Sequence, residues 1–241
     1  MGVRIHDSEL AELLITEPFL RSSESALPTL AKHELWSAST ASQWAERLKD
    51  HRNTASSTGE GRTSIHGNSI TGSLTAYIKL EGLTSNIIEN RISGSLGMHT
   101  GNIMDSLMQI HSQQIRGDNT NSSDVLSLQA LWHCSFITLF ADLNRIELAV
   151  GREGFEKSQQ HTSYVVEWAR SADGARCALH AALVLRNVED LAIGAEPAIH
   201  VPRVVYRSAL VWYAYTRYGQ GDSPPQVNMD FPELSKLGIN G

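Results

Sequence analysis

The chain has 241 residues, a hydrophobic content of 41% and a formal net charge of −6. This length and composition are those of a globular protein and argue against wholesale disorder. Because Lys and Arg are never clustered and no uninterrupted apolar run reaches the roughly 18 residues that span a bilayer, neither DNA binding by this chain alone nor a membrane location is expected.

The cysteines also limit the class of protein. Cys134 and Cys177 each lie inside an apolar helical pattern, which predicts buried thiols in a reducing compartment. The ligand spacings of a zinc finger are absent from this chain. The N-terminal residues lack a basic region followed by an apolar core, so no secretory signal is expected.

The first half of the chain predicts short helices separated by polar loops. Asp7 or Ser8 is expected to cap a first helix that Pro18 ends, because the residue before a proline disfavours helical dihedrals. A second helix should begin after Thr40, and residues 51–68, rich in Ser, Thr, Gly and Asn, are typical of an exposed loop. Two further helices are expected over 69–92 and near 99–115.

Residues 124–150 predict one long helix that is apolar around most of its circumference. Apolar side chains recur at steps of three and four from Val125 to Val150, and Gly151 can supply a left-handed stop. A helix of this kind cannot face water, so we expect it to lie in the middle of other helices.

Three more helices follow in the pattern: one over 161–170, one capped by Asp173 and closed by Gly194, and one from Pro202 closed by Gly219. The predicted fold class is therefore all-α, an irregular multi-helix bundle with a buried central helix. The predicted units are N-terminal helices with an exposed loop, an all-α core and a flexible tail, over 1–68, 69–219 and 220–241.

Three segments of the second half carry a family resemblance. They read LWHCSFITLFADLNRIELAVGREG (131–154), VVEWARSADGARCALHAALVL (165–185) and AIHVPRVVYRSALVWYAYTRYG (198–219). The first combines a Trp-His opening with an A-D-x-N-x-x-E-x-A-x-G-R-x-G close, and the second contains A-R-x-x-L-H-A. Together they resemble the fungal-specific transcription factor regulatory domain, or middle homology region, in the version attached to fungal Cys2His2 zinc-finger regulators.

This resemblance implies a function. Residues 69–219 would be the regulatory core of a nuclear RNA polymerase II transcription factor, not an enzyme, that contacts other domains of the parent protein or co-regulators. Members of the family carry zinc fingers N-terminal to this core, and this chain has none. The resemblance therefore implies that DNA binding and zinc belong to fingers upstream of this chain, with no cofactor in the chain itself.

One carboxylate of the predicted central helix needs a partner. Asp142 lies on the apolar stripe, and a carboxylate that is even partly buried there must be paired or protonated. Arg176 and His180, on the helix after Asp173, are the natural candidates. The group is either an acid/base pair in a pocket or a structural polar contact between core helices. We favour a structural polar core of Asp142, Arg176 and His180, because no nucleophile or Gly-rich phosphate loop accompanies it.

A zinc site is the second chemical possibility. His133-Cys134 and Cys177-x-x-His180 supply residue types that bind zinc. Adjacent residues on a helix point about 100° apart, so His133 and Cys134 cannot easily converge on one ion. We therefore predict no metal site, and no catalytic or cofactor site, in this chain.

A third possibility is phosphohydrolase chemistry. His6-Asp7 is similar to the His-Asp pair of metal phosphohydrolases, but His99, His111 and His161 form no obvious further set. A solvated helix start with Asp7 as its cap is favoured. An all-α metal-dependent hydrolase is kept as the alternative function, supported only by these scattered histidines.

The last long helix carries aromatic residues that suggest either base stacking or packing. The mixed spacing of Trp212, Tyr213, Tyr215 and Tyr218 favours packing in a core and an interface. Aromatic residues and arginines are common at interface hot spots. The candidate protein interface consists of Arg203, Arg207, Trp212 and Arg217. After this helix, DFPELSKL (230–237) mixes acidic and apolar residues as activation segments do, although an uneventful extension is favoured.

Overall fold

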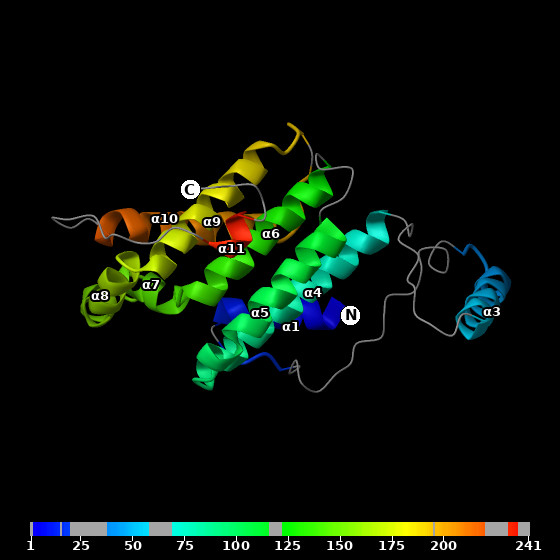
Figure 1. Ribbon diagram of the computed structural model, residues 1–241, viewed down its shortest axis with the longest axis horizontal. Coiled ribbons are helices and arrows are strands. Elements are labelled where there is room, and N and C mark those ends of the chain that lie inside the picture. Colours follow the sequence, from blue (N-terminus) through cyan, green and yellow to red (C-terminus); the bar gives the residue numbers. More distant parts are fainter. Residues whose placement is uncertain are drawn as a thin grey trace.

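All regular structure in the described part of the chain is helical. The computed structural model describes residues 2–14, 16–19, 38–57, 69–115, 122–194, 196–219 and 231–235. No strand occurs within these ranges, so the predicted all-α fold is confirmed (Figure 1). In chain order the elements are α1 (Gly2–Leu14), α3 (Ala41–Ser57), α4 (Ser69–Ile92), α5 (Leu96–Ile110), the π-helical turn η2 (His111–Ile115), α6 (Ser123–Phe140), α7 (Leu143–Ala149), α8 (Phe155–Ala169), α9 (Ala172–Glu189), α10 (Val201–Tyr218) and α11 (Pro232–Ser235).

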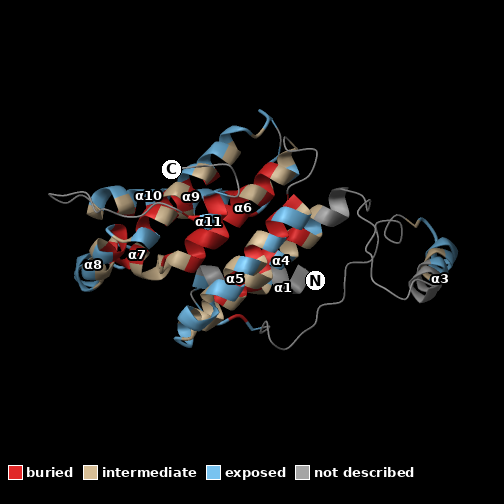
Figure 2. Cartoon of the chain, viewed as in Figure 1, coloured by how far each residue is buried: buried red, intermediate tan, exposed pale blue. Residues whose placement is uncertain are grey.

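Helix α6 is the centre of the bundle. Every residue from Ala130 to Leu139 is buried, whichever way its side chain points (Figure 2). The surrounding helices are α4, α5, α9 and α10, and α9 makes the most extensive contact with α6. The N-terminus of α6 is capped by Ser122, whose hydroxyl oxygen accepts from the Val125 amide at 3.3 Å. The prediction of a buried central helix is confirmed.

The central helix is shorter than predicted. The expected continuous helix over 124–150 is wrong, because α6 ends at Phe140 and α7 runs at 77° to it. Ala141 is extended, and the Asp142 side chain accepts from the Arg145 amide at 3.2 Å, which caps the new helix. Gly151, at a φ of +105°, forms the left-handed stop after α7.

Among the described helices, this bent pair is the one that meets the length and composition of a membrane span. No single helix in the described ranges is both long enough and apolar enough to span a bilayer. Helices α6 and α7 meet the length and composition only when they are taken together, across the 77° bend. Packing inside the bundle accounts for the apolar character of α6.

The first turn of α9 lies very close to the last turn of α8. A Cβ atom on Gly174 would lie 2.2 Å from the carbonyl oxygen of Trp168, so only glycine fits in this first turn. The predicted cap Asp173 is wrong by two positions, since the Ser171 hydroxyl accepts from the Gly174 amide at 3.2 Å. Serine in the extended conformation reaches the free amides of the first turn, whereas Asp173 already lies inside the helix.

The two described helices of the N-terminal unit predicted over 1–68, α1 and α3, differ in their contacts with the bundle. Helix α1 packs on α4, with the Ser8 and Ser85 hydroxyls in contact and the Tyr77 hydroxyl donating to Glu9 at 2.8 Å. Helix α3 lies apart from the bundle (Figure 1). It continues to Ser57, so the predicted loop is wrong over 51–57, and its remainder over 58–68 lies outside the described residues. Extending an existing helix gains one hydrogen bond per residue, which favours continuation through polar residues.

The tail predicted to be flexible over 220–241 is wrong at one place. Residues 231–235 return to the bundle, and Phe231 and Leu234 are buried against Ala175 of α9. We call this segment the C-terminal anchor. The rest of the tail lies outside the described residues.

Trp132→Ala is expected to lower the free energy of unfolding by about 3–5 kcal/mol. The indole is fully buried, donates from Nε1 to the Leu107 carbonyl at 2.8 Å and packs on His111 and Phe136. Denaturant unfolding followed by circular dichroism measures the loss. The control is Trp44→Ala on exposed α3, which should change stability by less than about 0.5 kcal/mol. Equal effects of the two substitutions would contradict this placement of Trp132.

Candidate functional site

The chemically richest place is a buried polar cluster between α6, α9 and the C-terminal anchor. It consists of His133, Arg176, His180 and Glu233. His133 on α6 and His180 on α9 are both buried, and their Nδ1 atoms are 2.8 Å apart. Such a contact needs one protonated and one unprotonated nitrogen, so at least one of the two rings is neutral.

Glu233 completes the cluster with its negative charge. Its Oε1 atom lies 3.0 Å from Nε of Arg176 and 3.6 Å from Nε2 of His180. The guanidinium of Arg176 lies between the rings of Phe140 and Phe231, at 4.1 and 4.7 Å from their centroids. A charge-paired arginine that is also stacked between two aromatic rings is held firmly in place.

The electrostatics of the cluster follow from its burial. Burial lowers the pKa of His133 well below its ordinary value, and it also lowers the pKa of His180 against the opposing effect of Glu233. For Glu233 burial acts to raise the pKa, but nearby His180 and the charge of Arg176 outweigh it and hold this pKa below the ordinary value. The arrangement is a neutral histidine pair beside an Arg–Glu ion pair.

This chemistry favours a structural role over catalysis. Neither His180 nor the side chain of Glu233 is exposed, so a substrate has no route to them in this state. Burial also raises the pKa of the Cys177 thiol, which opposes formation of a nucleophilic thiolate. Its Sγ donates instead to the Ile137 carbonyl at 3.9 Å.

The predicted polar core is corrected in one member. The prediction that Asp142 pairs with Arg176 or His180 is wrong, because the bend after α6 directs Asp142 to cap α7. Its backbone amide also donates to the Tyr164 hydroxyl at 2.9 Å. The carboxylate that Arg176 and His180 share is Glu233, from a segment we interpreted as an extension. Its signal in the sequence was an acidic residue between Phe231 and Leu234.

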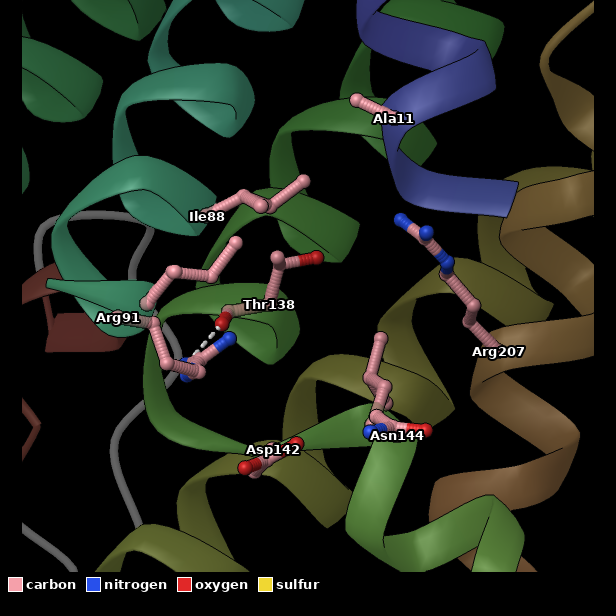
Figure 3. Close-up of a pocket in the computed structure, with 9 residues that line it drawn as sticks. Ala11, Ile88, Arg91, Thr138, Asp142, Asn144 and Arg207 are labelled. Carbon is pink, nitrogen blue, oxygen red and sulfur yellow. Dashed lines mark hydrogen bonds between the residues drawn. The ribbon is translucent and has the colours of Figure 1, made fainter. Parts of the chain in front are cut away.

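A second feature is the α6–α7 pocket, a cavity of about 250 Å³ at the bend. Arg91 of α4 and Arg207 of α10 lie on opposite sides of it, with Asp142 and Asn144 between them (Figure 3). Arg91 Nη2 donates to the Thr138 and Leu139 carbonyls at 2.6 and 3.1 Å. Arg91 is thus committed to the carbonyls at the end of α6, where helix carbonyls lack intrahelical partners.

A third feature is the α9–α10 groove, a mainly apolar depression of about 340 Å³. Its apolar lining includes Ala181, Ala182, Leu185, Val205, Ala209 and Trp212, and Arg186 and Glu189 also line it. Trp212 is 49% exposed and Leu185 is 54% exposed, although both are large apolar side chains. Exposed apolar side chains gathered in one groove mark a contact surface.

The residues predicted as one protein interface do not lie together. Trp212 lies in the α9–α10 groove, whereas Arg207 lines the α6–α7 pocket. Arg203 is only 13% exposed and is 2.5 Å from Glu81, so its prediction as an interface residue is wrong. The cause is Glu81, a buried carboxylate on α4 that needs a cation. Arg217 is exposed, with its guanidinium 5.9 Å from the ring of Tyr218.

The histidines in the described part of the chain lie apart from any group of metal-binding side chains. Within the described ranges, no three His, Cys, Asp or Glu side chains are grouped so as to hold an ion. His6 is exposed and 3.6 Å from Glu9. Asp7 does not cap the start of α1, which begins at Gly2; its Oδ1 accepts from the Phe19 amide at 3.0 Å.

No protein-family model, curated protein or solved structure matches the sequence.

Acid is expected to destabilise the fold in steps. Burial lowers the pKa of His133, His180 and His200, so below pH about 6.5 the unfolded chain takes up protons before the folded chain does. Stability is therefore complete above that pH and falls as pH falls, by up to about 1.4 kcal/mol per pH unit for each histidine. Glu233, whose pKa is also lowered, adds a further loss below pH about 4.5.

Denaturant unfolding at pH 5 to 8 measures this slope. His180→Gln should reduce it, because a glutamine amide can still contact His133 but cannot be protonated in this range. A wild-type chain whose unfolding free energy is constant from pH 7.5 to 5 would contradict the assignment of buried neutral histidines.

Arg203→Met is expected to cost about 3–5 kcal/mol of unfolding free energy, because it leaves the carboxylate of Glu81 buried without its cation. Arg217→Met, on the exposed side of the same helix, is the matched control and should cost less than about 0.5 kcal/mol. Thermal or denaturant unfolding measures both losses. A loss for Arg203→Met as small as that for Arg217→Met would show that Arg203 is peripheral.

Proposed function

We propose that this chain is the regulatory and interaction domain of a fungal RNA polymerase II transcription factor that acts in the nucleus. Its support begins with the three segments that resemble the middle homology region. These segments cover the second half of α6, all of α7, the end of α8, most of α9 and all of α10. DNA binding and zinc belong to fingers outside this chain, and the chain itself uses no cofactor.

The observation that carries this proposal is the α9–α10 groove. Both of its helices lie in segments of the resemblance, and its large apolar residues, Leu185 and Trp212, are exposed. Tryptophan is among the residues enriched at interface hot spots. The groove therefore fits another domain of the parent protein or a co-regulator as its partner.

The alternative, an all-α metal-dependent hydrolase, rested on scattered histidines. Among the described histidines, His133 and His180 are buried and contact each other, and Nε2 of His200 donates to the Ser127 carbonyl oxygen at 2.9 Å. No specific observation favours hydrolysis, so the interaction domain is the function we put forward.

A reporter assay tests the interaction proposal. The whole chain is fused to an unrelated DNA-binding domain, and reporter transcription is compared with that of the DNA-binding domain alone. We expect the fusion to raise or lower reporter transcription relative to the DNA-binding domain alone. Trp212→Ser should reduce the size of this effect about fivefold, because a hot-spot contact is worth about 1 kcal/mol or more. Trp44→Ser on exposed α3 is the control and should leave the effect intact. A fusion that behaves like the DNA-binding domain alone would overturn the proposal.

The isolated chain is expected to bind DNA weakly and without sequence preference. Its net charge is −6 and its cations are dispersed, so the dissociation constant at physiological salt should be about 10⁻⁴ M or weaker. Fluorescence anisotropy with labelled duplexes over a salt series measures it. Submicromolar, sequence-selective binding by this chain alone would contradict the assignment of DNA binding to fingers elsewhere.

A further inference from the structure

The C-terminal anchor is a short segment that packs on the bundle through a few buried side chains. Phe231, Glu233 and Leu234 are buried, and Leu234 packs in a small apolar cluster with Ala175 and Leu179 of α9. The helix it contains, α11, has four residues, too short to be stable without this contact. The connecting residues 220–230 have the sequence QGDSPPQVNMD, with a glycine and two prolines.

The recess that receives Glu233 is charged and aromatic. We define the carboxylate recess as Phe140, Arg176 and His180, from α6 and α9. Arg176 stacks on Phe140 at 4.1 Å, and its Nε faces the Glu233 carboxylate at 3.0 Å. Arginine is a common partner of carboxylates in proteins and also stacks on aromatic rings.

Glu233 lies close to Arg176 and His180, but the atoms in contact are not aligned for hydrogen bonds. Neither of its carboxylate oxygens has a well-directed hydrogen bond within the described ranges, and neither do Nε of Arg176 and Nε2 of His180. Charge therefore holds Glu233 in place without the directed hydrogen bonds that make a buried pair strong. A contact of this kind is weaker than the same groups could make.

The recess also has a second partner for its cation. The Asp173 carboxylate lies 3.8 Å from Nη1 of Arg176, one turn away on the same helix, and is about half exposed. When Glu233 leaves, Arg176 keeps a carboxylate nearby, so the open state does not strand a buried charge. Arg176 itself is 15% exposed, which places one edge of the recess at the surface.

We propose that the carboxylate recess is a peptide-binding site for a Phe-x-Glu-Leu segment, occupied here by the chain's own C-terminal anchor as an exchangeable ligand. A partner segment of the same chemistry displaces the anchor when it is supplied in trans. Because the anchor belongs to the same chain, it competes as an intramolecular ligand and occupies the site until a tighter ligand competes. The inference does not depend on the proposed role in transcription.

The test measures binding of a fluorescein-labelled peptide of residues 228–238 to the full-length chain by anisotropy. Phe231→Ala with Leu234→Ala in the chain removes the apolar contacts of its own anchor and leaves the recess intact. This double variant should bind the peptide at least about tenfold more tightly than the wild type, because the competing intramolecular ligand is weakened. The same peptide carrying Glu233→Gln should bind at least about tenfold less tightly, as expected when a charged pair is lost.

Two matched substitutions locate the site on α9. Added to the double variant, Arg176→Met should abolish peptide binding, whereas Arg186→Met, an exposed residue of the same helix at the α9–α10 groove, should leave it unchanged. The proposal is overturned if the double variant, folded by circular dichroism, binds no better than wild type, or if the Glu233→Gln peptide binds equally well.

Hydrogen exchange of the wild-type chain gives an independent outcome. The amides of Leu234 and Ser235 donate to the Phe231 carbonyl at 2.9 and 3.0 Å, so their exchange reports opening of the anchor. We expect them to exchange through local opening, much faster than buried amides of α9. Equal protection of the anchor and α9 would show that the anchor is a permanent part of the core and would overturn the proposal.

Discussion

The burial of α6 is the constraint on which the rest of the structure depends. A helix that is apolar all round must be enclosed, and α4, α5, α9 and α10 enclose it (Figure 2). Its polar side chains must then be satisfied inside the protein. Ser135 and Thr138 donate to the carbonyls one turn earlier, and Trp132 donates to the Leu107 carbonyl. Only the Trp132 bond reaches another helix, and it fixes how α5 is placed against α6.

The histidine of α6 extends this constraint to the far end of the chain. Through its Nδ1, His133 contacts His180 of α9. On its other side His180 faces Glu233, which in turn pairs with Arg176. A series of polar contacts thus runs from His133 in the centre of the bundle, through α9, to the C-terminal anchor. The need of a buried charge for a partner also explains why Arg203 is mostly buried: it pairs with the buried carboxylate of Glu81.

Helix α9 connects the two proposals. One face carries Arg176 and His180 and receives the C-terminal anchor, while the other lines the α9–α10 groove through Ala181, Ala182 and Leu185. A helix has this capacity because positions three or four apart share a face and the positions between them point elsewhere. Both proposed contact surfaces therefore lie on one helix, next to the enclosed histidine pair.

The local part of the structure could be determined from the sequence. Apolar periodicity of three and four predicted α4, α6, α9 and α10 and their burial, because the pattern and the caps lie within each helix. The bend at Ala141 had a local signal too, since an aspartate before an apolar helical run is a capping residue. We interpreted Asp142 instead as a buried charge in search of a partner.

The pairing of charges was decided by the tertiary structure alone. Arg176 and His180 were predicted to share a carboxylate, and they do share one, but it is Glu233 and not Asp142. Likewise, Arg203 of α10 pairs with Glu81 of α4 and does not face a partner protein. Periodicity determines which face of a helix is buried, whereas the identity of an ionic partner depends on which segments, distant in sequence, the packing brings within a few ångströms.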